Sequence, residues 1–202
     1  MAPRKVDPEA RRAEVLGAAV RVFARKGFAA SRIEDVAAEA GIAKGSVYLA
    51  FESREALLRA AFDEFAAESA AQLRRATTGG GPAIDRLTGL IRSTFALLTG
   101  APELSRMLLD LWSIGRGVDA DLPLDMATVY DGYRTAIADL LRAAEADGAV
   151  RPGVGIGHAA VVVGAIEGCL LQWLIDPALP VATLADTIVD VCVNGIGAEK
   201  NS

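Results

Sequence analysis

The chain has 202 residues, of which 52% are hydrophobic and 23% are charged. This length allows one large domain or a small domain joined to a medium one, and the apolar content excludes a chain that is disordered throughout. The N-terminal residues are charged and contain no apolar run of the kind that signal peptides have, so we expect a cytoplasmic protein.

Charge is distributed unevenly along the sequence. The formal net charge is -5, yet residues 1–60 carry eleven Lys and Arg residues against eight Asp and Glu residues. The rest of the chain carries ten basic residues against eighteen acidic ones. A basic segment on an acidic body is typical of proteins that bind a polyanion through one part of the chain, so a nucleic acid is a candidate partner.

Four helical patterns come first in the chain. They span residues 8–26, 31–40, 44–50 and 54–76. Asp7 is placed to cap the first helix, and Ser31 with Glu34 three residues later fits a capping box at the start of the second. Gly41 is expected to end the second helix, because a C-cap favours the left-handed conformation that glycine adopts readily.

Five further helical patterns follow, at residues 83–99, 102–115, 122–147, 156–176 and 181–197. Gly and Pro residues separate them, and no segment shows the alternation of apolar and polar residues that is typical of a strand. The sequence therefore predicts an all-α protein of about nine helices. The compact N-terminal part is expected to end near Leu58, which divides the chain into residues 1–58 and 59–202.

The segment from Gly27 to Leu58 is the most informative about function. The third predicted helix begins with Lys44, Gly45 and Ser46, and Tyr48 follows on the same turn. A first turn with a cation, a backbone without a side chain and a hydroxyl group can enter a DNA major groove and contact both phosphates and base edges. The segment is therefore a candidate helix-turn-helix.

Residues of this segment occur in an order that a known family shares. They are Gly27-Phe28, Ser31, Val36-Ala37, Ala40-Gly41-Ile42, Lys44-Gly45-Ser46, Tyr48, Phe51, Ser53-Arg54-Glu55 and Leu57. This ordered set resembles the DNA-binding domain of the TetR family of transcriptional regulators. The resemblance implies a TetR-like fold, with an N-terminal three-helix helix-turn-helix domain and a C-terminal helical domain for ligand binding and dimerisation. It also implies a homodimer that binds palindromic, double-stranded operator DNA.

The residues expected to contact DNA lie in and before the second, third and fourth helices. They are Ser31, Arg32, Lys44, Gly45, Ser46, Tyr48, Leu49 and Arg54. The sequence departs from the family's pattern at Ala43, where a Ser often caps the recognition helix, and such a loss costs about 0.5–2 kcal/mol. It also departs at Leu49 and Ala50, where a second aromatic and a polar residue are common. Leu49 is expected to contribute an apolar contact, for example to a thymine methyl group.

The resemblance places a dimer interface in residues 59–202. The helix at 156–176 is apolar on nearly every side, so it and the last helix are expected to form a four-helix contact with a second copy. The alternative is that both helices belong to the core of one subunit. The candidate interface residues are Ala159, Gly164, Gly168, Leu171, Leu184, Ile188 and Val191.

The resemblance also implies a small-molecule site in the same domain. The candidate residues are Phe95, Met107, Leu111, Trp112, Met126, Tyr130, Tyr133, Glu167, Cys169 and Trp173. Aromatic and Met side chains suit an apolar, adaptable site, and plain core packing is the alternative for each residue. Glu167 is expected either to hydrogen-bond the ligand, to pair with an arginine such as Arg92 or Arg134, or to reach solvent.

The apolar part of the predicted helix at 156–176 raises the question of a membrane span. Residues 159–175 fall short of the roughly 20 residues that a spanning helix needs, and the central acid Glu167 would be costly in lipid. We therefore expect a buried helix and no membrane partner.

Cys169 and Cys192 are expected to be reduced thiols, with a disulfide or a metal pair as the alternative.

The function predicted from these patterns is a transcriptional repressor that a small, mostly apolar ligand releases from its operator. The alternatives are a helical small-molecule-binding module and an activator-type regulator without ligand-released repression. An enzyme, a cofactor and a metal site are not expected, because the sequence has no nucleophile elbow, Walker loop or metal-ligand cluster. His158 is expected to cap a helix or to lie at the surface.

Overall fold

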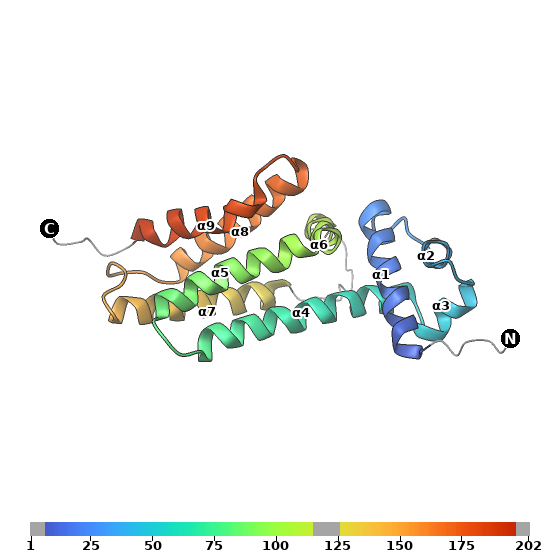
Figure 1. The fold of residues 1–202 in the computed structure, drawn as a ribbon, viewed down its shortest axis with the longest axis horizontal. Coiled ribbons are helices and arrows are strands. Elements are labelled where there is room, and N and C mark those ends of the chain that lie inside the picture. The colour runs from blue at the N-terminus through green and yellow to red at the C-terminus, as the bar shows by residue number, and fades with distance from the viewer. Residues whose placement is uncertain (1–6, 115–125, 197–202) are drawn as a thin grey trace. The chain divides into compact units, whose positions relative to one another are not determined.

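The computed structural model describes residues 7–114 and 126–196, with the backbone alone for residues 110–114 and Ile196. The elements in these residues are helices (Figure 1). They are α1 (Pro8–Lys26), α2 (Ile33–Ala40), α3 (Lys44–Ala50), α4 (Arg54–Thr78), α5 (Ala83–Gly100), α6 (Pro102–Ile114), α7 (Met126–Ala146), α8 (Ile156–Ile175), α9 (Val181–Cys192) and a 3-10 turn, Asn194–Ile196. The predicted all-α fold is confirmed, and each predicted helix has a counterpart.

The described residues form two compact units. The first contains the residues up to Ala66 together with α6, which packs against α1, and the second contains residues 67–101 and those from Met126 onward. α4 therefore begins in the first unit and ends in the second. The functional division into residues 1–58 and 59–202 stays a prediction.

In the first unit, α1, α2 and α3 pack against one another around a small apolar core. The core residues of these helices are Val15, Ala18, Ala19, Val22, Phe23, Ile33, Val36, Ala37 and Val47. They recur at intervals of three or four residues within each longer helix, which is the spacing that places them on one face. Gly41 has φ 65°, the left-handed conformation expected from the sequence, and it joins α2 to α3 through a short turn.

The start of α2 differs from the predicted capping box. The helix begins at Ile33 with Arg32 as its N-cap, and the Asp35 carboxylate accepts a hydrogen bond from the Arg32 N–H at 3.0 Å. Ser31 is 1% exposed, and its hydroxyl donates to the Gly27 carbonyl at 2.6 Å. The predicted N-cap is therefore wrong by one residue, because the burial of Ser31 commits its hydroxyl to the preceding turn.

In the second unit, α5, α7, α8 and α9 pack pairwise around a larger apolar core (Figure 1). Its most deeply buried large residues are Leu87, Leu90, Ile91, Ile137, Leu140, Leu141 and Val162. The C-terminal half of α4 adds Leu73 and Ala76 to this core. At the start of α8, the Gly155 N–H donates to His158 Nδ1 at 3.3 Å, so His158 is a capping residue as expected.

α8 is the most apolar helix and is only partly covered by its own subunit. It has 20 residues and is long and apolar enough to cross a membrane by those two criteria alone, which corrects the sequence-based conclusion drawn from the apolar stretch at residues 159–175. One such helix is weak evidence for a span, because core helices of soluble proteins pass the same test. Ala159, Val162, Ile166 and Leu170 are buried, whereas the opposite side is exposed. A single subunit therefore covers only one side of α8, and the expected coverage of the other side by a second copy stays a prediction.

Candidate functional site

α3 presents most of its residues to solvent. Val47 is its buried residue, whereas Lys44 and Gly45 are exposed, Tyr48 is 47% exposed and Leu49 is 90% exposed. Residues three and four apart share a helix face, so these four form one continuous surface. Ser46 is half-buried beside it. Ala43 is the N-cap and makes no side-chain cap bond, as its identity predicts.

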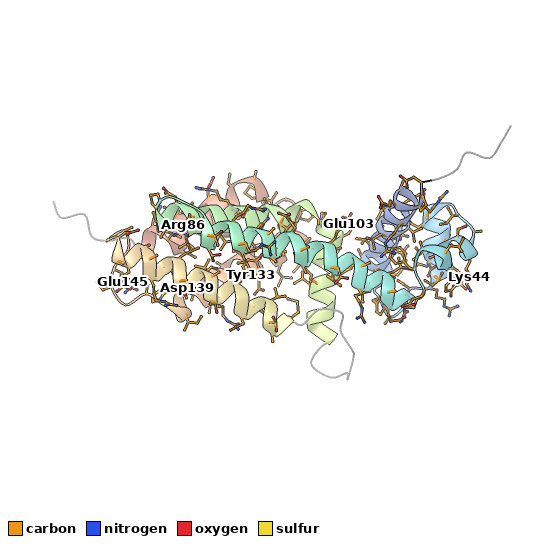
Figure 2. All side chains as sticks on the ribbon, turned by 90° about the horizontal axis from the view of Figure 1, so that it is seen from below. Lys44, Arg86, Glu103, Tyr133, Asp139 and Glu145 are labelled. Atoms are coloured by element: carbon orange, nitrogen blue, oxygen red, sulfur yellow. The ribbon has the colours of Figure 1, made fainter. Side chains whose placement is uncertain are left out.

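An ion pair positions Lys44 (labelled in Figure 2). Lys44 Nζ lies 2.6 Å from Glu34 Oε1. The hydrogen bond lowers the pKa of Glu34 and raises the pKa of Lys44, so both groups are charged at neutral pH. Further ion pairs of this unit join Arg21 and Arg25 to Glu39, and Lys26 to Asp35. Much of the basic charge counted in the sequence, including that of Lys44, is therefore paired inside the unit, whereas Arg32 is exposed.

Arg54 has a structural role that the sequence analysis did not predict. Its Nη1 donates to the carbonyl oxygens of Phe28 at 3.0 Å and Ser31 at 2.7 Å, and its guanidinium carbon lies 4.2 Å from the centre of the Phe28 ring. These contacts tie the start of α4 to the loop between α1 and α2. The expected phosphate contact would require the guanidinium to leave these carbonyls. Ser31, also expected at the DNA, is buried and does not offer its side chain to a partner.

Arg54→Ala should consequently destabilise the fold. Two hydrogen bonds from a charged donor and a ring contact are lost, so we expect the free energy of unfolding to fall by about 1.5–3 kcal/mol. Arg54→Lys should restore little of this, because an ammonium does not reproduce the planar fork of a guanidinium. Urea denaturation followed by circular dichroism measures both. Unchanged stability combined with weaker DNA binding would assign Arg54 to a phosphate instead.

The candidate ligand-binding residues belong to both units. In the second unit, Phe95 is buried, whereas Met126, Tyr130, Tyr133, Glu167, Cys169 and Trp173 are half-buried. Met107 is buried in α6, which belongs to the first unit. The side chains of Leu111 and Trp112 lie outside the described residues. Both cysteines are free thiols.

Polar contacts join the helices inside the second unit. The Tyr133 hydroxyl lies 2.6 Å from Ser69 Oγ, and Gln72 Nε2 donates to the Ser93 carbonyl at 3.3 Å (Figure 2 labels Tyr133). Burial, together with a hydrogen bond to Glu167, raises the pKa of Tyr130. Burial also raises the pKa of Glu167.

The sequence analysis missed three buried polar residues of this unit. Ser69, Gln72 and Thr94 are 5%, 7% and 7% exposed. The signal that could have found them is a polar residue on the apolar face of an amphipathic helix. One expected partner of Glu167, Arg92, is paired elsewhere. Its Nε atom lies 2.7 Å from the Asp186 carboxylate.

The candidate interface residues divide between the core and the surface. Ala159 is 0% exposed and Ile188 is 3% exposed, so these two pack inside their own subunit and offer no surface to a partner. Gly164, Leu171 and Val191 are exposed, and Gly168 and Leu184 are half-buried. The sequence analysis missed the exposed apolar residues Ile156, Val161 and Ile175, since nothing polar marks the outer side of α8.

Known proteins resemble the chain over the helix-turn-helix and over its whole length. Residues 15–61 match the family described as "Bacterial regulatory proteins, tetR family". The chain is 24% identical to the fatty acid metabolism regulator protein of Bacillus subtilis, covering 91% of this chain and 94% of that protein. It is 27% identical to the nicotine-responsive transcriptional repressor HdnoR of Paenarthrobacter nicotinovorans, covering 93% of this chain and 96% of that protein. Residues 15–61 of the chain therefore carry the DNA-binding domain of the TetR family.

The fold of the chain also matches a solved structure. The transcriptional regulator FadR from Bacillus subtilis, in complex with stearoyl-CoA, superposes with a TM-score of 0.72 at 23% identity, covering 91% of this chain and 98% of that one. The predicted TetR-like fold is thereby confirmed. The relatives are transcriptional regulators, which are not enzymes.

Proposed function

We propose that this TetR-family regulator is a repressor that binds palindromic operator DNA as a homodimer and is released by a small, mostly apolar ligand. The observation that carries the proposal is the exposed face of α3, where a cation, a glycine, a tyrosine and a leucine lie together. Repression is favoured over activation because the similar protein HdnoR is named a repressor.

Gly45 supports the approach of DNA to α3. A Cβ added at this position would meet no atom within 4 Å, and the backbone is not in the left-handed region, so the described fold does not need glycine there. Glycine inside a helix costs roughly 0.5–1 kcal/mol relative to alanine. A glycine that the subunit does not require is explained by a partner that approaches the backbone closely, as a DNA groove does.

The exposed side of α8 supports a homodimer. Val161, Leu171 and Ile175 are 64%, 43% and 75% exposed. Gly164 and Gly168 lie between them in the sequence, and a Cβ added at either glycine would meet no atom within 4 Å. The steps of three and four residues place all five on one face, which we call the α8 strip. An apolar strip with small residues at its centre suits close contact with the same strip of a second copy.

The interior of the second unit supports release by a small molecule. The similar FadR structure contains stearoyl-CoA, and HdnoR is described as nicotine-responsive, so related chains respond to small molecules with large apolar parts. In this chain, Ser69 and Gln72 attach α4 to α7 and α5, while Arg54 anchors the other end of α4 beside α2. A ligand that prefers the DNA-free conformation of α4 would shift the population away from DNA, whereas equal affinity for both conformations would shift nothing.

DNA binding by α3 can be tested with Lys44→Ala and Tyr48→Ala. Both side chains are exposed, so the fold should survive, and each change should weaken operator binding by about ten- to a hundredfold, since such contacts contribute about 1–3 kcal/mol. Lys44→Ala should also reduce the salt dependence, because one fewer phosphate is neutralised in each half-site. Fluorescence anisotropy with labelled DNA from upstream of the protein's own gene, over a range of salt concentrations, measures both effects.

Glu34→Gln is the matched control for this experiment. It removes the acid that pairs with Lys44, so the lysine becomes available and a negative charge near the phosphates disappears. DNA affinity should rise in this variant. If Lys44→Ala and Tyr48→Ala both bound DNA as the wild type does, α3 would not be the recognition helix.

A further inference from the structure

A layer of polar side chains crosses the interior of the second unit. It consists of Ser69 and Gln72 on α4, Thr94 on α5, Tyr130 and Tyr133 on α7, and Glu167 on α8, and we call it the polar layer. Gln72 donates a hydrogen bond to the carbonyl of Ser93, the residue before Thr94. Ser69, one turn before Gln72 on α4, forms a hydrogen bond with Tyr133. Tyr130, one turn before Tyr133, bonds Glu167. These bonds connect α4 to α5 and to α7, and α7 to α8.

Two oxygen atoms of the polar layer lack a partner. Gln72 Oε1 and Thr94 Oγ1 are buried and accept or donate no hydrogen bond in the described structure. Both residues are 7% exposed, so bulk water does not replace the missing partners. Buried polar atoms in native proteins nearly always have a partner, and an exception calls for an explanation. The bonds of Gln72 Nε2 and of Ser69 hold these side chains in place, which leaves the oxygens available for a further group.

Glu167 adds a carboxylate that pairs with no cation among the described residues. Its side chain is half-buried on the most apolar helix and accepts a hydrogen bond from Tyr130. The two arginines expected as possible partners form other pairs, since Arg92 lies 2.7 Å from Asp186 and Arg134 lies 3.8 Å from Asp131. No ion pair of Glu167 occurs among the described residues. A half-buried carboxylate is stabilised most by a cation that brings its own hydrogen-bond donors.

We propose that the polar layer binds the polar end of the regulator's ligand, and that this end is a protonated amine attached to an apolar body. The open positions of the layer are mainly acceptors, namely Gln72 Oε1 and the Glu167 carboxylate, and an ammonium group supplies up to three donors and a positive charge. A carboxylate or phosphate ligand would be repelled by ionised Glu167, whereas an ammonium group favours that ionised form. The buried residues Leu90, Ile91 and Phe95, on the same helix as Thr94, suit the apolar body. This inference rests on the proposed small-molecule response.

The test uses two series of probes that differ only in their polar end. One consists of 4-phenylbutylamine, 4-phenylbutan-1-ol and 4-phenylbutanoate, and the other consists of the corresponding n-decyl amine, alcohol and acid. Isothermal titration calorimetry on the full chain at neutral pH measures each affinity. In at least one series the amine should bind about tenfold or more tighter than the alcohol, with the acid weakest, because a charge-assisted bond to a buried carboxylate is stronger than a neutral one.

Variants separate ligand recognition from a structural role. Glu167→Gln should reduce the affinity for the amine to that for the alcohol and leave the affinity for the alcohol nearly unchanged. Gln72→Leu should weaken amine binding with little change in the melting temperature, since removal of an unpaired buried acceptor offsets the lost bond to the Ser93 carbonyl. Asp139→Asn, an equal change of charge on the exposed side of α7 (labelled in Figure 2), is the control and should leave the preference intact.

An amine that binds no tighter than its alcohol in both series overturns the inference, as does a preference that persists in Glu167→Gln. DNA anisotropy with the same probes distinguishes this failure from failure of the proposed function. If the alcohol or the acid releases DNA as well as the amine does, the inference is overturned and ligand-released repression stands. If the amine binds with the expected preference but leaves DNA bound, the inference stands and release by ligand is refuted.

Discussion

Gly164→Arg should convert the protein from a dimer into a folded monomer at micromolar concentration. A single subunit can accommodate the arginine, because a Cβ at Gly164 would meet no atom within 4 Å and the position is exposed. In the proposed dimer, the same side chain would place an unpaired charge in the centre of the α8 strip. Such burial costs several kcal/mol, so the dissociation constant of the dimer should rise by about a hundredfold or more. Sedimentation velocity over a concentration series measures it.

Gly89→Arg is the control for that change. Gly89 is an exposed glycine inside α5, also without an atom within 4 Å of an added Cβ, and it lies outside the α8 strip. This variant should remain a dimer. The monomeric variant should also lose operator affinity, because two linked half-sites bind far more tightly than one. A wild-type protein that is monomeric at micromolar concentration, or a Gly164→Arg protein that stays dimeric, would show that the strip has another role.

Gly45→Leu should abolish tight operator binding without harming the fold. The single subunit has open space at this position, and leucine is a better helix former than glycine, so the melting temperature should be equal to or above that of the wild type. If DNA approaches the backbone of α3 at Gly45, the new side chain obstructs both half-sites of the dimer. A loss of about 1–3 kcal/mol in each half-site corresponds to about a hundredfold or more in affinity.

Gly89→Leu provides the comparison, because it makes the same substitution on an exposed helix far from α3 in sequence. It should stabilise the protein in a similar way and leave DNA affinity unchanged. The two measurements are thermal unfolding and anisotropy with the same labelled operator. A Gly45→Leu protein with wild-type DNA affinity would mean that Gly45 does not face the DNA backbone or bases.

The sequence alone determined the helices and the face of α3. Helix periodicity, the glycine at position 41 and the order of residues from Gly27 to Leu57 are local signals, since each depends on residues a few positions apart. They predicted α3 from Lys44 to Ala50 and the exposure of Tyr48 and Leu49, and the structure agrees. The cap of α2 was predicted one residue early because Glu34 and Asp35 are equally plausible partners until the burial of Ser31 is known.

Only the tertiary structure decided which side of α8 is buried and which polar groups meet. In a helix that is apolar all round, no polar face marks the solvent side, so Ala159 and Val161 cannot be told apart by periodicity. Arg54 meets the carbonyl of Phe28 across 26 positions, and Ser69 meets Tyr133 across 64. Contacts at such separations depend on how whole helices pack, which the spacing of residues within one helix does not encode.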